Sequence, residues 1–82
     1  MSSYQAFIEE VVKSVVEYPD DVKVTEEAQE NGKLFLISCH QGDVGKVIGK
    51  SGRVIASIRN VVGAIASKQR ERAFVKVVTQ DE

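Results

Sequence analysis

Residues 43–53 read DVGKVIGKSGR, a stretch that places three glycines and three cations within eleven positions. Glycines let a backbone turn sharply and approach a ligand closely, because they carry no Cβ. Lysine and arginine attract anionic oxygens. The stretch therefore predicts a phosphate site, and the phosphate belongs either to a nucleotide or to the backbone of a nucleic acid.

The stretch fits neither of two common nucleotide-binding motifs. The P-loop, G-x-x-x-x-G-K-[ST], needs four residues between its glycines, whereas only three separate Gly45 from Gly49. The dinucleotide fingerprint G-x-G-x-x-G needs a glycine where Val47 stands. What remains is a G-x-x-G loop, residues 49–52, between two helical segments. The first turn of the following helix offers unpaired N–H groups to phosphate oxygens.

The chain before the loop predicts a helix and a hairpin. Apolar residues recur at spacings of three and four over residues 3–17, which predicts an amphipathic helix ended by Pro19. Residues 22–28 and 33–39 suit strands, and Asn31-Gly32 between them is a hairpin turn signal. The second segment is apolar over four consecutive residues, which predicts a central strand covered on both faces or nearly so.

The chain around and after the loop predicts two helices and a strand. Asp43 is expected to cap a short helix over residues 44–48, and a second helix is expected over residues 53–67. The apolar stripe of this second helix predicts its core-facing side, which consists of Val54, Ile55, Ile58, Val61, Val62 and Ile65. A last strand over residues 73–79 and a tail over 80–82 complete the order α-β-β-α-α-β.

The segment from Val47 to Arg53, VIGKSGR, resembles the (V/I)-I-G-x-x-G signature of KH domains. The element order is similar to that of type II KH domains, the prokaryotic arrangement. The resemblance extends over essentially the whole chain, residues 1–82, to the small bacterial single-KH proteins of the KhpA (YlqC-like) family. It implies an α+β type II KH fold in which a three-stranded mixed sheet carries three helices on one face.

The resemblance further implies that the chain binds single-stranded RNA, with the loop clamping about four nucleotides by their backbone. The residues that it assigns to RNA binding are Lys46, Val47, Ile48, Gly49, Lys50, Ser51, Gly52 and Arg53. The strand from Leu34 to Cys39 is expected to form the opposite wall of the RNA groove. None of the chain's five aromatic residues lies in the loop or its two helices, which predicts little stacking on bases. The resemblance also implies an RNA chaperone or post-transcriptional regulator.

The second helix has an unusual outward side, because nearly all of its residues there are small. A solvated helix face normally carries Lys, Glu or Gln, and Gly63 inside a helix costs up to about 1 kcal/mol relative to Ala. Small residues permit close approach of another helix, which predicts a homodimer contact with Arg59 at its margin. Its predicted members are Ala56, Asn60, Val61, Gly63, Ala64 and Ser67. The family resemblance likewise implies dimers, including pairing with a larger KH protein of the Jag/EloR type.

Composition limits the possible functions. The chain has 82 residues, 43% of them hydrophobic and 28% charged, so it is globular but shorter than nucleotide-hydrolysing α/β domains usually are. It offers no positioned acid–base pair and no metal cluster, so we expect no catalysis, cofactor or metal. The single cysteine, Cys39, predicts a reducing compartment. The first residues are unlike a signal peptide and no apolar run is long enough to cross a bilayer, so the expected location is the cytoplasm.

Charge is distributed unevenly, and several interpretations stay open. Residues 1–45 hold nine acids against three lysines, a net of −6, whereas residues 46–82 hold eight bases against three acids, a net of +5. The split indicates either a basic face for polyanions or an ordinary solvated surface. Arg70 and Arg72 either extend the phosphate track or solubilise a turn, and His40 either touches a base or has no special role. The alternative to RNA binding is a protein-interaction adaptor that pairs with other KH proteins.

Overall fold

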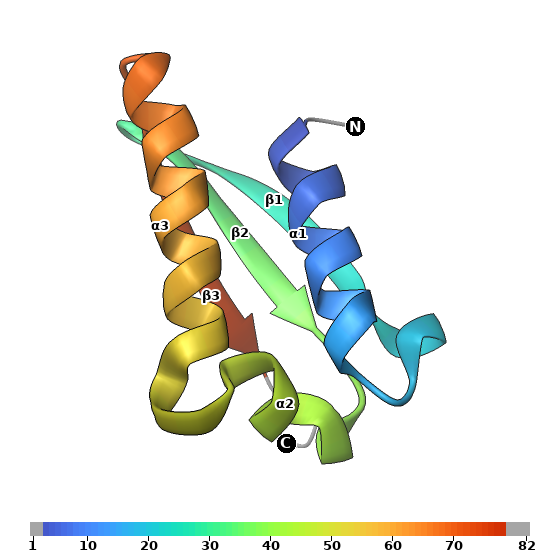
Figure 1. Cartoon of the computed structure of the whole chain (residues 1–82). Helices are drawn as coiled ribbons and strands as arrows, with labels where there is room; N and C mark the ends of the chain where they lie inside the picture. The colour runs from blue at the N-terminus through green and yellow to red at the C-terminus, as the bar shows by residue number, and fades with distance from the viewer. Residues whose placement is uncertain (1–2, 79–82) are drawn as a thin grey trace.

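The structure, a computed structural model, describes residues 3–78 and consists of three α-helices and a three-stranded sheet over that range (Figure 1). The elements follow the order α1 (Ser3–Val15), β1 (Lys23–Gln29), β2 (Gly32–Ser38), α2 (Val44–Ile48), α3 (Arg53–Lys68) and β3 (Arg72–Val78). Short 3-10 turns occupy Pro19–Asp21, Gln41–Asp43 and Lys50–Gly52. The predicted order is confirmed, and each boundary shifts by no more than two residues. The predicted strand residue Thr79 and the tail at 80–82 lie outside the described residues.

The sheet has the order β1-β2-β3, with β1 antiparallel and β3 parallel to the central β2. The Asn31-Gly32 hairpin lies against the start of β3, where the Arg72 N–H donates to the Asn31 carbonyl at 3.2 Å. A Cβ on Gly32 would stand 1.8 Å from the Arg72 carbonyl oxygen. Glycine is therefore required at this position for the hairpin to approach β3.

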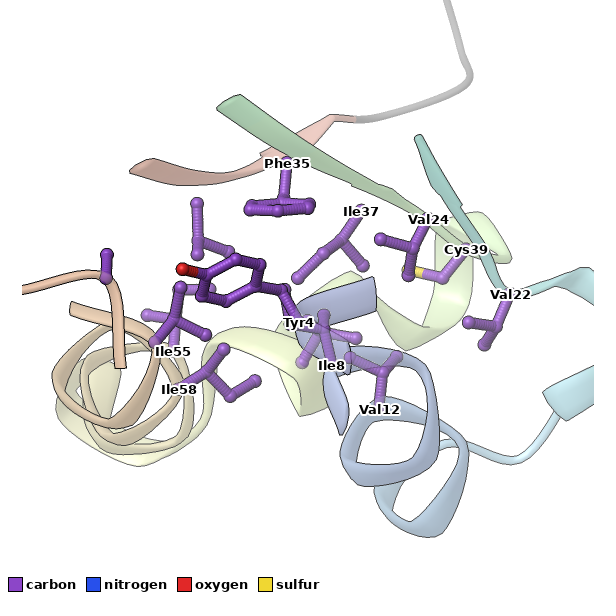
Figure 2. Close-up of a cluster of buried hydrophobic side chains, with 14 residues drawn as sticks. Tyr4, Ile8, Val12, Val22, Val24, Phe35, Ile37, Cys39, Ile55 and Ile58 are labelled. Atoms are coloured by element: carbon purple, nitrogen blue, oxygen red, sulfur yellow. The ribbon is translucent and has the colours of Figure 1, made fainter. Parts of the chain in front are cut away.

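The core lies between the sheet and the helices, which all cover the same face of the sheet (Figures 1 and 2). Phe35 and Ile37 of β2 point into this layer and are completely buried. Leu34 and Leu36 alternate with them and lie on the helix-free face, where they are half-buried. β2 is thus the central strand, as predicted, and its cover is complete on the helix side but only partial on the other, because three strands and three helices form only two layers.

Helix α1 ends at Val15, earlier than the expected residue 17. The side chain of Asp43, 1% exposed, accepts hydrogen bonds from the backbone N–H groups of Glu17 and Tyr18 at 3.2 and 3.0 Å. These bonds draw the two residues out of the helix. They also correct the prediction for Asp43 itself, whose carboxylate makes no side-chain cap of α2.

The buried stripe of α3 differs from the predicted one at two positions, since it leaves out Val61 and includes Ala66. Ile55, Ile58, Val62 and Ala66 are buried, whereas Val61 is 42% exposed. The prediction for Val61 is wrong because Val61 sits at the edge of the apolar arc, over the junction with α1 rather than over the sheet. Within residues 3–78, no helix has the length and apolar character that a bilayer-spanning segment needs.

Candidate nucleic-acid interface

The loop between α2 and α3 reverses the chain through three residues with positive φ. Gly49 has φ 85° and ψ 168°, Ser51 has φ 56°, and Gly52 has φ 74°. A Cβ on Gly49 would stand 2.5 Å from Cγ2 and 2.7 Å from the backbone nitrogen of Val54. No Cβ can be accommodated at that distance, so glycine is required both for the conformation and for the close approach to α3.

The loop presents the amino end of α3 to solvent together with two cations. Gly52 is the N-cap residue of α3 and, among the described residues, no side chain caps this helix end. The first N–H groups of a helix have no intrahelical partners and carry about half a positive charge. Lys50, Ser51 and Arg53 surround this end and are exposed. The arrangement suits phosphate oxygens, because donors and positive charge converge on one point.

The residues before the loop support it in different ways. Val47 is completely buried, so it anchors α2 to the core and does not reach the surface. Ile48, the next residue, is 38% exposed and offers an apolar surface beside the loop. Lys46 is exposed, and its Nζ lies 3.9 Å from the Asp43 carboxylate. Of the eight predicted RNA-binding residues, all but Val47 are thus at least partly accessible.

Helix α3, which follows the loop, lies against β3, the edge strand of the sheet, whereas β2 is the central strand. The expectation that the strand from Leu34 to Cys39 forms the second wall of the RNA groove stays a prediction. Arg59 joins α3 to β3, because its Nε donates to the Val75 carbonyl at 3.1 Å.

A pocket of about 690 Å³ lies where the end of α3, the start of β3 and the hairpin meet. Its lining residues are Asn31, Gly63, Ser67, Arg70, Glu71, Arg72, Ala73 and Phe74. Phe74 is 48% exposed and is in register with Leu34, so its ring lies on the helix-free face of the sheet. No pattern in the sequence showed that Asn31 lies beside the end of α3, since the two are far apart along the chain.

The outward side of α3 carries the six residues predicted for a dimer contact. Ala56, Asn60 and Ala64 are exposed along its crest, whereas Gly63 and Ser67 turn toward β3. Val61 turns the other way, toward α1. There it lines an apolar groove of about 370 Å³ together with Phe7, Val11 and Val15.

His40 and Cys39 lie at the end of β2. His40 is half-buried and stacks on the Tyr18 ring, with ring centroids 4.1 Å apart, and its Nδ1 accepts from the Gly42 N–H at 2.9 Å. Cys39 is buried, and burial together with the nearby Asp43 carboxylate raises the pKa of its thiol. Residues 3–78 contain no group of three His, Cys, Asp or Glu residues arranged for a metal ion.

The mixed three-stranded sheet, the three helices on one face and the G-x-x-G loop between α2 and α3 define a type II KH fold. Residues 5–77 match the family model described as KhpA/KhpB, KH domain. Proteins named RNA-binding protein KhpA are similar over most of the chain. The one from Oceanobacillus iheyensis is 35% identical over 90% of this chain and 99% of its own length. That of Halalkalibacterium halodurans is 36% identical over 90% and 97%, and that of Streptomyces coelicolor 41% identical over 74% and 77%. The chain belongs to the KhpA/KhpB family of KH-domain proteins.

Proposed function

We propose that this protein binds single-stranded RNA without catalysis, by clamping the sugar-phosphate backbone at residues 49–52. The observation that carries the proposal is the exposed Lys50-Ser51 pair, held by two positive-φ glycines at the uncapped amino end of α3. Membership of a family whose similar proteins are named RNA-binding supports it. No group in the described residues offers an alternative chemistry at this loop.

Each part of the site has a distinct role in this proposal. The N–H groups at the start of α3 and the side chains of Lys50 and Arg53 hold backbone phosphates. Bases then lie beside α3, against the apolar surface of Ile48 and the outer edge of β3. Val47 holds α2 in place beneath the loop and makes no contact with the RNA.

The decisive experiment replaces Lys50 and Ser51 with Asp and measures binding of pooled cellular RNA by filter retention. We expect at least a tenfold loss of affinity, because one positive charge is lost and two negative charges are placed where the phosphates would bind. A matched control exists on α1, where Lys13-Ser14 repeats the same dipeptide in exposed positions. The Lys13→Asp, Ser14→Asp variant is expected to bind RNA with wild-type affinity. Equal losses of affinity in both double variants would contradict the proposed site.

Salt dependence provides a second measurement. Each phosphate neutralised on a single strand lowers the slope of log K against log salt concentration by about 0.7. The wild-type protein is therefore expected to have a clear negative slope. The Lys50→Asp, Ser51→Asp variant is expected to have a shallower slope, because fewer phosphates are neutralised.

We further propose a cytoplasmic RNA chaperone or post-transcriptional regulator that acts as a dimer through Ala56, Asn60, Val61, Gly63, Ala64 and Ser67. Small side chains on the crest of α3 and an exposed valine beside an apolar groove support a helix-to-helix contact. The same contact is proposed for a heterodimer with a Jag/EloR-type KH protein. Replacing Gly63 and Ala64 with Glu is expected to halve the mass measured by light scattering, and an unchanged mass would exclude this interface.

The second candidate function is a protein-interaction adaptor whose RNA contact is incidental. The small-residue side of α3 favours it, whereas the basic loop opposes it. The two functions differ in one measurement, since an adaptor keeps its partner binding and its cellular role after the Lys50→Asp, Ser51→Asp change. An RNA-binding regulator loses that role.

A further inference from the structure

The helix-free face of the sheet carries an exposed phenylalanine between two cations. Side chains two residues apart along a strand point to the same face, and Val75 of β3, which is 5% exposed, belongs to the core. Its neighbour Phe74 is in register with Leu34 on the helix-free face. Arg72 and Lys76, two residues before and after Phe74, share that face with it. All three side chains are exposed.

The surroundings of the Phe74 ring are apolar. Leu34 and Leu36 of β2 lie on the same face and are half-buried. Neighbouring strands are about 4.8 Å apart, so these side chains and the ring form one continuous patch. The solvated face of a sheet normally carries polar side chains. A flat apolar patch with an exposed ring suits the face of a nucleobase, since every base can stack on an aromatic side chain.

The charges beside the patch favour an anionic ligand and place it over β3. Among residues 3–78, neither Arg72 nor Lys76 forms an ion pair. The acid Glu27 lies on the same face, but it is the register partner of Leu34 on β1. It is therefore two strands away from Phe74, at about 10 Å. The β3 side of the face is positive, so a polyanion is expected to follow β3 and to avoid β1.

This face can be reached from the loop at residues 49–52. Strand β3 starts after the end of α3 and runs back to α2, the helix that leads into the loop (Figure 1). Arg59 lies on α3 six residues after Arg53, a rise of about 9 Å. Its Nε donates to the Val75 carbonyl, so a further cation stands at the outer edge of β3, one residue from both Phe74 and Lys76. A strand leaving the loop can pass Arg59 and continue onto the helix-free face.

The same charges disfavour a second copy of this chain as the occupant. A symmetric dimer contact joins the same patch of both subunits. It would bring two copies of Arg72 and Lys76 together with no described acid between them, and like charges at an interface are unfavourable. A nucleic acid instead neutralises these cations.

We propose that the helix-free face along β3 binds RNA, next to the segment of the same strand that residues 49–52 hold. One base stacks on the Phe74 ring. Arg72 and Lys76, each about 7 Å from Phe74 along the strand, bind the phosphates on either side. Aromatic side chains on the open sheet face of RRM domains stack on bases in the same manner. The inference rests on the proposed RNA binding for the identity of its ligand, and it adds that the protein binds a strand longer than four nucleotides.

The test compares RNA oligonucleotides of about four and about twelve nucleotides, titrated by fluorescence anisotropy. Wild-type protein is expected to bind the longer strand about tenfold more tightly. Phe74→Leu keeps an apolar side chain but removes the ring, and it is expected to lose about fivefold of that gain or more while binding the short strand within about twofold of wild type. Phe74→Tyr keeps the ring and is expected to keep the gain.

Two further measurements separate stacking from phosphate binding. Phe74→Trp introduces a tryptophan into a chain that has none, so quenching of its fluorescence reports a base on the ring. The longer strand at saturation is expected to quench it, and unchanged fluorescence would contradict stacking. Replacing Arg72 and Lys76 with Gln is expected to make the salt slope for the longer strand shallower by about 1.4, since two phosphates are no longer neutralised.

The matched control is Lys23→Gln, which removes a cation from the same face at β1, beside Asp20 and Asp21. It is expected to retain the gain with length. The proposal is overturned if Phe74→Leu also retains the gain, or if wild type shows none. A Phe74→Leu variant that retains the gain but loses mass in light scattering would assign the face to a protein contact instead.

Failure of the proposed clamp gives a different result. In that case the Lys50→Asp, Ser51→Asp variant binds the short strand as wild type does, whereas Phe74→Leu still loses the gain with length. The two sites can therefore be contradicted independently.

Discussion

The buried carboxylate of Asp43 accepts a 3.0 Å hydrogen bond from the backbone N–H of Tyr18 and thereby joins the end of α1 to the start of α2. A second bond comes from the Glu17 N–H at 3.2 Å. Helix α2 leads directly into the loop at residues 49–52. The direction of the proposed clamp therefore depends on a contact made by the segment that follows the first helix.

Asp43→Ala is expected to lower the free energy of unfolding by about 2–3 kcal/mol. The change removes a buried carboxyl acceptor and leaves the N–H groups of Glu17 and Tyr18 without this partner. Urea denaturation followed by circular dichroism measures this loss. Asp21→Ala, at an exposed acid close to the same junction, is the control and is expected to stay within about 0.5 kcal/mol of wild type.

The two glycines of the loop are expected to tolerate alanine differently. Gly52→Ala puts an alanine in the left-handed backbone region, with its Cβ in open space, and is expected to lower the free energy of unfolding by about 1–2 kcal/mol. Gly49→Ala adds the clash with Val54 in a backbone region that is almost exclusive to glycine, and costs about 3 kcal/mol or more. Thermal denaturation of both variants shows which of them loses more stability. Equal costs would mean that the clash at Gly49 does not exist.

Alkaline pH is expected to destabilise the protein partly through Tyr4. Burial, followed by the hydrogen bond to Glu71, raises the pKa of Tyr4 above its ordinary value of 10.0. Above that value the unfolded chain loses the proton and the folded chain keeps it, so the stability linked to neutral Tyr4 is complete below pH 10.0 and falls as the pH rises toward the folded pKa.

Tyr4→Phe tests this linkage with denaturant titrations at neutral pH and above pH 10.0. At neutral pH the variant is expected to be about 1 kcal/mol less stable, because the single hydroxyl proton shared by Gln69 and Glu71 is lost. Above pH 10.0 that difference is expected to shrink, since only the wild type has a buried tyrosine to ionise. A difference that does not change with pH would contradict the linkage.

Two adjacent valines of α3 are expected to behave oppositely. Val62 is completely buried, and Val62→Ala is expected to cost about 1.5–3 kcal/mol through lost contacts and a cavity. Val61 is 42% exposed, and Val61→Ala is expected to stay within about 0.5 kcal/mol in the monomer. Chemical denaturation of both variants at low protein concentration measures the contrast. Similar losses would place Val61 in the core after all.

Features that depend on neighbouring residues could be predicted from the sequence. The helices of α1 and α3 follow from apolar spacing, and the hairpin follows from Asn31-Gly32. The loop at residues 49–52 follows from two glycines whose positive φ values no other residue type accepts so readily. In each case the periodicity or the turn chemistry acts within a few residues. The element order and the proposed phosphate clamp could therefore be predicted from the sequence alone.

Features that depend on distant partners were decided only by the tertiary structure. Asp43 resembles a helix cap in the sequence, but its hydrogen-bond partner Tyr18 lies 25 residues away. The sequence likewise does not show which strand lies at the edge of the sheet, and it is parallel pairing to β2 that puts β3 there, beside α3. The pocket joins a hairpin, a helix end and a strand start, and no local pattern encodes that meeting. Such contacts arise because packing selects among many arrangements with equally good local structure.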